Sequence, residues 1–544
     1  MNLRRLQEGP WQAFERLIAR FIEHQGFYDV SVVGGSNDKG ADIVGLYKNE
    51  RWIVQAKYRS NGSVGRKPIE EVYKAKWDYD GDVLVCVSNQ KFSRDALKYR
   101  SELKEKGFRV LLWNQDKLLS FDKKVSIDSK FKKDLRTYQR KAVDKIHLSL
   151  HSDRNKGLIT LATGLGKTII ASTFISEYLE KNQGSKVLVL AHMTDLVRQL
   201  DRECWSQFSK YVETHLWTDG ETPAYGEGVT FATWQSISAA FKNGEYLENI
   251  FDLIVVDECH HAPSESFSSI LRSLNSKYLL GLTATPWRGD RVSLEGLFGN
   301  PIFSMDIVEG MQKGYLSKVD YQMMTDGIDW DEIRLLSKQG LTIKDLNTKL
   351  YIPERDLGMI EEVSEVIHST KNPSVLVFCR SINHAERLQI FFRTFGIAAG
   401  VIHSDLHRSE RFVTLSDFRL GKMKVLISIE MLNEGIDVPA VNIVVFARVT
   451  HSRRIFLQQL GRGLRLKGKK THVKVLDFVA DIRRIAAAYD LNEAAYGYKD
   501  REDVSYPNGD IVKFSKEPQD FFLEYLSDMS NISDLDEDAH LDFP

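Results

Sequence analysis

Three polar side chains interrupt the apolar stretch GADIVGLYKNERWIVQAKYRS (residues 40–60): Asp42, Gln55 and Lys57. If residues 52–57 form a strand, Gln55 and Lys57 share one face, because alternate residues of a strand point to the same side. Asp42 would lie on the preceding strand of the same hairpin, so that all three side chains could converge. A carboxylate, an amide oxygen and a lysine suit Mg²⁺-dependent hydrolysis of a phosphodiester. The competing interpretation is a hairpin with a solvent-facing glutamine and lysine.

In a nuclease each of these residues would have a chemical task. Asp42 would bind Mg²⁺, and the Gln55 amide oxygen and a backbone carbonyl near Ala56 would complete the shell, since Mg²⁺ prefers oxygen ligands. Lys57 would orient or help deprotonate the attacking water and offset charge in the transition state. Glu15, on an amphipathic helix predicted near the N-terminus, could add a carboxylate. Gln55 carries no negative charge, so the sequence leaves open a domain that only holds DNA.

A second group of residues has the spacing of a phosphate-binding loop. The segment LITLATGLGKTII (158–170) places an apolar strand directly before a glycine-rich turn that ends in Gly-Lys-Thr, although Leu161 stands where the usual pattern has glycine. Backbone N–H groups of such a turn, and the N-terminus of the following helix, bind phosphates. Lys167 would contact the β- and γ-phosphates, and the Thr168 hydroxyl would reach Mg²⁺. The expected nucleotide-binding residues of the loop are Thr163, Gly164, Gly166, Lys167 and Thr168.

Two acidic residues follow another apolar strand, in FDLIVVDECHH (251–261). Asp257 and Glu258 would lie at the carboxyl end of this strand, which is where open α/β sheets bind ligands. Asp257 would hold Mg²⁺ and Glu258 would polarise the attacking water. Two exposed acids after a strand are the plainer interpretation, which fits poorly beside a phosphate-binding loop.

The chain resembles superfamily 2 helicases and translocases over about residues 131–480. The motifs occur in the order typical of that family. They are LRTYQ, which ends at Gln139; VLVLAHMTDLVRQ (187–199); TWQS (233–236); DECH (257–260); GLTATP (281–286); VLVFCRS (375–381); VLISIEMLNEGIDVP (425–439); and QQLGRGLR (458–465).

This resemblance implies that ATP binds between two RecA-like domains, with Gln139 at the adenine. Arg462 and Arg465, three residues apart on an expected helix, could face the phosphates together, and arginine suits phosphate because its planar fork stays charged. Gln458 would help to order the nucleotide and water, and Asp437 could touch the ribose. In the family, the GLTATP segment couples hydrolysis to domain movement through Thr283 and Thr285.

The N-terminal region is similar to the Mrr-type branch of the PD-(D/E)xK restriction endonucleases, in which glutamine replaces the usual second acid. The matching segments cover most of residues 8–120. They are FERLIARFIEHQGF (14–27), GGSNDKGADIVG (34–45), WIVQAKY (52–58) and VLVCVSNQKFSRDAL (83–97). The resemblance implies a nuclease fold, with Asp42, Gln55 and Lys57 at its site and Mg²⁺ as its metal.

The bulk composition excludes several other classes. The chain has 544 residues, 42% of them hydrophobic and 27% charged, with a formal net charge of −1. There is thus no global basic signature, although a local basic surface is enough to bind DNA. The four cysteines form no CxxC pair, which disfavours a disulfide framework, a zinc finger or an iron–sulfur cluster. Without a signal peptide or a bilayer-spanning apolar run, the expected location is the cytoplasm.

The expected fold class is α/β: a restriction-endonuclease-like α/β domain followed by two RecA-like parallel-sheet domains. The predicted divisions are the nuclease-like domain (1–120), a polar lysine-rich linker (121–133), a first RecA-like domain that binds ATP (134–310), an irregular connector (311–360), a second RecA-like domain (361–480) and a C-terminal extension with an acidic tail (481–544).

The leading functional hypothesis is an ATP-dependent DNA translocase or helicase with a fused Mg²⁺-dependent DNA endonuclease, acting in restriction or defence against foreign DNA. Its cofactors would be ATP and Mg²⁺, and its partner duplex DNA, tracked along a single strand or the backbone, with no membrane. The alternative is a DNA-repair helicase whose N-terminal domain only binds DNA. The sequence also leaves open a homo-oligomer or a subunit of a larger defence complex.

Overall fold

In the computed structural model the chain divides into two compact units. The first comprises Met1–Leu161, Gly166–Ser304 and His407–Ser416; the second comprises Ala162–Leu165, Met305–Leu406 and Asp417–Pro544. The described residues are 6, 10–34, 39–151, 155–218, 221–223, 226–245, 247–248, 250–262, 265–284, 294–324, 338–342, 355–379, 381–429, 441–447, 472–478 and 511–513. No helix within these ranges is long and apolar enough to cross a bilayer.

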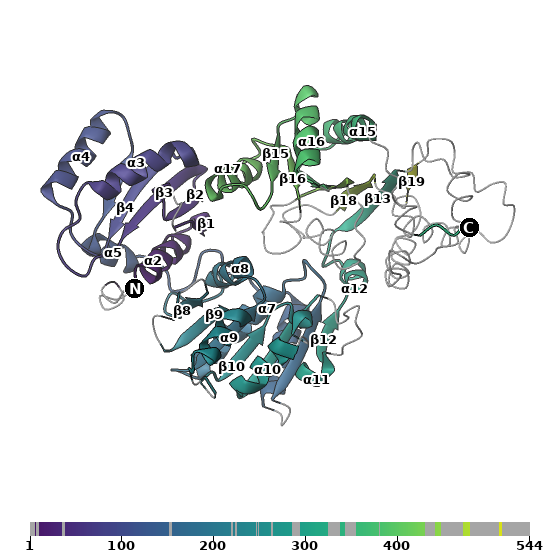
Figure 1. Ribbon diagram of the computed structural model, residues 1–544, viewed down its shortest axis with the longest axis horizontal. Coiled ribbons are helices and arrows are strands. Elements are labelled where there is room, and N and C mark those ends of the chain that lie inside the picture. Colours follow the sequence, from purple (N-terminus) through teal and green to yellow (C-terminus); the bar gives the residue numbers. More distant parts are fainter. Residues whose placement is uncertain are drawn as a thin grey trace. The chain divides into compact units, whose positions relative to one another are not determined.

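The N-terminal part of the first unit is built on a five-stranded mixed sheet (Figure 1). Its strands lie in chain order: β1 (Tyr28–Val32), β2 (Ile43–Tyr47), β3 (Glu50–Lys57), β4 (Val83–Ser88) and β5 (Val110–Trp113). The pairs β1–β2 and β2–β3 are antiparallel, whereas β3–β4 and β4–β5 are parallel. Its helices are α2 (Trp11–His24), α3 (Lys67–Tyr79), α4 (Arg94–Glu105) and α5 (Gln115–Asp122).

Helices cover both faces of this sheet, because its central strands are apolar on both sides. Alternation along β3 divides its residues: Val54 and Ala56 join an apolar cluster with α2 and α5, whereas Ile53 joins a cluster with α3 and α4. Helix α2 contributes Phe14 and Ile18 to its cluster, at the i, i+4 spacing that the sequence predicts. The predicted helix near the N-terminus and the two predicted strands of the hairpin are confirmed as α2, β2 and β3.

The rest of the first unit contains a seven-stranded sheet in the order β12-β6-β11-β10-β7-β9-β8. The six strands from β6 to β8 in that order are parallel to their neighbours. The strands are β6 (Lys156–Leu161), β7 (Lys186–Ala191), β8 (Thr214–Trp217), β9 (Gly228–Thr233), β10 (Leu253–Val256), β11 (Tyr278–Thr283) and β12 (Pro301–Met305). The helices are α6 (Thr137–Leu150), α7 (Lys167–Lys181), α8 (Thr194–Trp205), α9 (Trp234–Lys242), α10 (Glu265–Leu274), α11 (Glu295–Phe298) and a short 3₁₀ helix (Cys259–His261).

The second unit holds another seven-stranded sheet, in the order β15-β16-β14-β17-β18-β13-β19. Its strands are β13 (Lys318–Met324), β14 (Val375–Cys379), β15 (Ala399–Ile402), β16 (Val425–Ser428), β17 (Ile443–Ala447), β18 (His472–Asp477) and β19 (Ile511–Lys513). Its helices are α12 (Ile307–Gln312), α15 (Arg355–Ser369) and α16 (Ile382–Thr394), while α17 (Arg408–Arg419) crosses the division between the units. All pairs are parallel except β13–β19, as a RecA-like domain requires.

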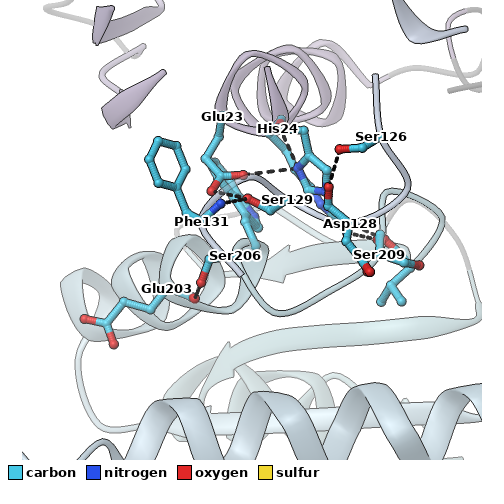
Figure 2. A network of polar contacts seen from close by, with 12 residues as sticks. Glu23, His24, Ser126, Asp128, Ser129, Phe131, Glu203, Ser206 and Ser209 are labelled. Atoms are coloured by element: carbon cyan, nitrogen blue, oxygen red, sulfur yellow. Dashed lines mark hydrogen bonds and ion pairs between the residues drawn. The ribbon is translucent and has the colours of Figure 1, made fainter. Parts of the chain in front are cut away.

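Two segments are more ordered than their composition suggested. The region 311–360, predicted to be irregular, contains β13, which pairs in parallel with β18. The mixed polar sequence of this strand, KVDYQMM, has no clear strand pattern. The strand forms because it pairs with β18 on one edge and β19 on the other. The polar segment after α5 is also held in place, because Ser129 is buried and its hydroxyl donates to Glu23 Oε1 over 2.9 Å (Figure 2).

Candidate nuclease and nucleotide sites

The hairpin β2–β3 carries the three residues singled out first. A two-residue turn joins its strands, with Lys48 and Asn49 at φ values of 52° and 64°. Two consecutive positive φ values give the turn whose twist matches paired antiparallel strands. The register opposes Ile43 and Val54, so the segment before β2 runs beside the end of β3.

Asp42 lies immediately before β2 and is fixed against β3. Its Oδ2 accepts a hydrogen bond of 2.7 Å from the backbone N–H of Ala56, between Gln55 and Lys57. The side chain is buried, with 4% of its surface exposed. A hydrogen bond from a backbone N–H stabilises a buried carboxylate, so this bond holds Asp42 beside the Gln55–Lys57 segment of β3.

Glu15, from α2, reaches the same place from the other side. A Cβ atom built on Gly34 would lie 2.7 Å from Glu15 Oε2 and 3.4 Å from Asp42 Oδ1. Both carboxylates therefore flank one point of the backbone, and Glu15 is also buried. Glycine at position 34 leaves the two carboxylates room to approach each other.

Gln55 and Lys57 complete the group. Gln55 is buried, and its Oε1 accepts no hydrogen bond from any residue that the structure describes. Burial raises the pKa of the Cys86 thiol, Asp42 and Glu71 raise it further and Lys57 opposes the shift, so these charged groups lie near this thiol. Cys86 is the residue opposite Gln55 in the β3–β4 pair. The structure thus places Asp42 against the Gln55–Lys57 segment of β3 and places Glu15 beside Asp42 at Gly34.

These residues fit a divalent cation. A buried amide oxygen without a protein partner beside two buried carboxylates is an arrangement that oxygen-seeking cations satisfy. Among the described residues there is no group of three or more His, Cys, Asp or Glu side chains suited to a metal. The Gln55 amide would therefore have to serve as a ligand with Asp42 and Glu15.

The phosphate-binding loop has the geometry that its glycines predict. Gly164 and Gly166 have φ values of 91° and 87°, in the left-handed region that favours glycine. The loop runs from the end of β6 into α7, whose first residue is Lys167. A Cβ on Gly166 would meet Gln139 Nε2 at 2.6 Å, so Gln139 lies directly against the loop. Thr163 and Thr168, also in this segment, are half-buried.

The DECH segment lies against this loop. Lys167 Nζ is 3.2 Å from Glu258 Oε1, which joins the loop lysine to the acid after β10. Glu258 has φ 45°, a strained conformation for a residue with a Cβ. Asp257 precedes it and donates its backbone N–H to Leu190 O over 2.9 Å. Both acids thus end β10 at the carboxyl edge of the sheet.

His260 connects this segment to β11. Its Nδ1 lies 3.3 Å from Glu258 Oε2 and 3.1 Å from Thr283 Oγ1, and both His260 and Thr283 are fully buried. A single imidazole therefore bridges the acid proposed to polarise water and the first threonine of the GLTATP segment. His260 was not among the predicted site residues, although its place in the DECH box marks it.

The pKa values of Asp257 and Glu258 are shifted in opposite directions. Burial, reinforced by the neighbouring Glu258 and opposed by Lys167, raises the pKa of Asp257 to about 7. Burial also disfavours the Glu258 carboxylate, but Lys167 and His260 hold the pKa of Glu258 well below its usual range. Glu258 is therefore ionised at neutral pH, as a group that polarises or deprotonates water must be.

Five of the predicted residues lie outside the described part of the chain. Four are the residues expected on the second RecA-like domain, and the fifth belongs to GLTATP. They are Asp437, Gln458, Arg462, Arg465 and Thr285. Gly34 is the residue of the nuclease group that sequence reasoning missed; its signal is the Gly-Gly pair at the end of the first strand region.

Three protein families match the chain in successive segments. Residues 6–121 match the family described as "Restriction endonuclease". Residues 132–288 match "Type III restriction enzyme, res subunit", and residues 358–467 match "Helicase conserved C-terminal domain". The nuclease residues and the phosphate-binding loop thus fall in separate matched segments, in the order that the sequence predicts.

Individual relatives and one solved structure are similar to large parts of the chain. The DNA 3'-5' translocase XPB2 of Sulfurisphaera tokodaii is 28% identical over 69% of this chain and 91% of its own length. The type I restriction enzyme EcoAI endonuclease subunit of Escherichia coli is 27% identical over 63% of this chain, but over only 46% of its own length. The structure of the ATP-dependent type ISP restriction-modification enzyme LlaBIII bound to DNA matches 86% of this chain and 36% of that one, with 19% identity and a TM-score of 0.52. This structural likeness concerns the fold.

Proposed function

We propose that this chain, in which a restriction endonuclease domain of the Mrr type precedes the two domains of a superfamily 2 helicase, moves along duplex DNA with ATP and cuts it with Mg²⁺. The biological setting that fits this pairing is restriction or defence against foreign DNA. The relatives named above include a translocase and a restriction subunit, so both activities have a counterpart among them.

One observation carries the nuclease half of the proposal. The buried Gln55 Oε1 has no protein hydrogen-bond partner in the described structure, and the next residue, Ala56, donates its backbone N–H to the buried carboxylate of Asp42. A buried polar atom left without a partner costs about 1–3 kcal/mol, so such atoms persist where a ligand uses them. Lys57 lies two residues after Gln55 in β3 and supplies the positive charge that phosphodiester cleavage needs.

The residues of the nuclease site then divide the work. Asp42, Glu15 and Gln55 would hold Mg²⁺, which supplies Lewis-acid activation of the phosphate and of water. The Ala56 N–H keeps Asp42 at the end of β3, so the ligand does not have to be ordered when DNA binds. Lys57 orients the attacking water and offsets the negative charge that grows on the phosphate.

In the motor, the described residues would bind the nucleotide and promote its hydrolysis. Gln139, which lies against the loop at Gly166, would contact the adenine, and the loop from Thr163 to Thr168 would surround the phosphates. Lys167, now paired with Glu258, would turn to the β- and γ-phosphates, which frees Glu258 to polarise the attacking water. Asp257 and Thr168 would hold Mg²⁺. His260 contacts both Glu258 and Thr283, so a movement of the Glu258 carboxylate would be transmitted to Thr283.

The residues of the second RecA-like domain extend this assignment. Arg462 and Arg465 would contact the phosphates during hydrolysis, with Gln458 ordering the nucleotide and Asp437 touching the ribose. Closure of the two domains on ATP and their opening after hydrolysis would move the chain along DNA. Cutting both strands with one nuclease site per chain would then take two copies.

A cleavage assay tests the proposal directly. Supercoiled and linear duplexes, with and without base modification, are incubated with the protein and Mg²⁺, in the presence and absence of ATP. The wild type should cut DNA, and Asp42→Asn should not, because the amide removes the charge that binds the cation. Asp78→Asn is the matched control, since Asp78 belongs to the same domain but forms an exposed ion pair with Lys39.

The competing function makes a different prediction. If the N-terminal domain only binds DNA, the wild type shows DNA-stimulated ATP hydrolysis but no cleavage under any of these conditions. Asp42→Asn then leaves every measured activity unchanged. The neutral Gln55, where many nucleases of this fold carry an acid, is the feature that keeps this alternative worth testing.

A further inference from the structure

Helix α2 has a basic face as well as an apolar one. Arg16, Arg20 and His24 recur every four residues, so they form one stripe along the helix. All three are buried, with 5%, 8% and 1% of their surface exposed. A charged stripe on a helix is usually solvated, and burying it requires partners. Glu15, proposed above as a metal ligand, lies on the same helix next to Arg16.

The partners of this stripe come from the first RecA-like domain. Arg16 forms an ion pair with Glu221, and Arg20 donates to the backbone carbonyls of Ser209 and Val212. These contacts join residues about two hundred positions apart within the first unit. The planar guanidinium of Arg20 donates to the two carbonyls through two separate nitrogens, an arrangement that a lysine ammonium reproduces only in part.

Helix α8 of the motor adds both apolar and polar contacts. Trp205, at its end, is fully buried in the same apolar cluster as Phe14 and Ile18 of the nuclease domain. Its Nε1 donates to Asp201 Oδ1 over 2.9 Å. Burial raises the pKa of Asp201, while Arg16 and Arg20 oppose the shift, so this carboxyl also faces the basic stripe. Trp205 therefore belongs to the nuclease core as much as to its own domain.

The segment 121–133 between the two domains also takes part in the contact between α2 and the motor. Lys210 Nζ donates to the carbonyls of Asp122 and Val125, over 2.9 and 3.1 Å, at the C-terminal end of α5. Ser129 donates to Glu23 Oε1, and Glu23 in turn contacts His24 at the end of the stripe (Figure 2). The carbonyl groups at a helix end favour a cation, so Lys210 caps a nuclease helix from the motor side.

We propose that the motor domain holds the nuclease site in order: Arg16 and Arg20, anchored on Glu221, Ser209 and Val212, are positioning residues that fix α2 and thereby Glu15. The inference rests on the nuclease function proposed above. It assigns to the interface a role in metal binding, because a carboxylate ligand is useful only when its helix is held at the right distance. The nuclease site is then complete only while it is docked on the motor.

Hydrogen–deuterium exchange of the full-length protein tests this without relying on cleavage. In the wild type, MgCl₂ should slow exchange of the α2 amides, because the cation ties Glu15 to the sheet. In Arg20→Ala the α2 amides should exchange at least about tenfold faster, and MgCl₂ should protect them less. Arg20→Lys should restore part of the protection. Arg109→Ala is the matched control, since Arg109 pairs with Glu50 on the exposed surface of the same domain.

A second variant changes only the motor side. Glu221→Gln should raise the Mg²⁺ concentration for half-maximal DNA cleavage about tenfold, while the rate at saturating Mg²⁺ changes little. A purely structural role would lower the saturating rate or the yield of folded protein and leave the Mg²⁺ requirement unchanged. DNA-stimulated ATP hydrolysis should be the same as in the wild type for both variants.

The possible failures are distinguishable. If the wild type never cuts DNA but MgCl₂ slows exchange in α2 and Arg20→Ala removes this effect, the nuclease proposal fails and the positioning inference stands. If cleavage occurs but Arg20→Ala and Glu221→Gln leave α2 exchange and the Mg²⁺ requirement at wild-type values, the positioning inference is wrong and the nuclease proposal stands.

Discussion

Replacing Gly34 by alanine probes the nuclease site without removing any of its functional groups. The new Cβ would lie 2.7 Å from Glu15 Oε2, 3.3 Å from its Cδ and 3.4 Å from Asp42 Oδ1. Ordinary contacts of carbon with other heavy atoms are about 3.5 Å, so Glu15 has to retreat by roughly 0.5 Å or more. Asp42 is already near a normal contact distance and can remain. The backbone of Gly34 is not left-handed, so alanine adds no backbone strain.

This displacement is large on the scale of metal coordination. Mg²⁺ demands near-ideal octahedral geometry with ligands at about 2.0–2.1 Å, so a carboxylate moved by roughly 0.5 Å is lost as a direct ligand. Misplacement on this scale lowers reaction rates by ten- to a hundredfold, by order of magnitude. We therefore expect Gly34→Ala to slow DNA cleavage by about that factor and to raise the Mg²⁺ requirement.

The assay is nicking and linearisation of a supercoiled plasmid over a series of MgCl₂ concentrations, with ATP hydrolysis measured in parallel. Hydrolysis should stay at the wild-type rate, because the substitution lies outside the motor. Gly65→Ala is the matched control: its Cβ would meet nothing within 4 Å, and its backbone is also not left-handed. Wild-type cleavage by Gly34→Ala, with an unchanged Mg²⁺ requirement, would refute the assignment of Glu15 as a ligand.

Three further substitutions follow from the two sites. Lys167→Ala should lower DNA-stimulated ATP hydrolysis by about a hundredfold or more, since it removes the charge that stabilises the phosphates; a variant with full activity would contradict the loop assignment. His260→Ala should leave ATP affinity near the wild-type value, measured with a fluorescent nucleotide, but lower the turnover about tenfold by loosening Glu258. Gln55→Glu should tighten Mg²⁺ binding in the nuclease domain, measured by calorimetry on a Lys167→Ala background, and lower the metal-free melting temperature. Unchanged Mg²⁺ affinity in that variant would mean that Gln55 is not a ligand.

Periodicity predicted the elements that carry the nuclease site, because alternation and helical spacing are local properties of the sequence. The hairpin from Asp42 to Lys57 and the apolar face of α2 could both be read in this way. The close approach of Glu15 to Asp42 could not, because it depends on how α2 packs on the sheet and on the space left at Gly34. Nothing in the sequence spacing of these two segments predicts that their side chains meet.

The buried basic stripe of α2 illustrates a second limit. In the sequence, Arg16 and Arg20 look like the solvated side of an amphipathic helix, which is the usual meaning of that pattern. Only the structure shows that Arg16 pairs with Glu221 and that the carbonyls of Ser209 and Val212 accept hydrogen bonds from Arg20. Backbone acceptors leave no trace in the amino-acid type, so a buried arginine that uses them cannot be told from an exposed one.

The charges around Gln55 offer a reason for its being neutral. Two carboxylates about 4 Å apart repel by about 4 kcal/mol at an effective dielectric constant near 20, and a third would add comparable terms to both. Asp42 and Glu15 already flank Gly34 from two sides and are both buried. When both are ionised they carry two negative charges, which is what a divalent cation neutralises. An amide at position 55 donates an oxygen to the cation without further repulsion in the metal-free state. On this reasoning a neutral Gln55 lowers the affinity for the metal but makes the metal-free site more stable. Docking of α2 on the motor then holds Glu15 in position, which a third charged ligand would otherwise help to do through the metal.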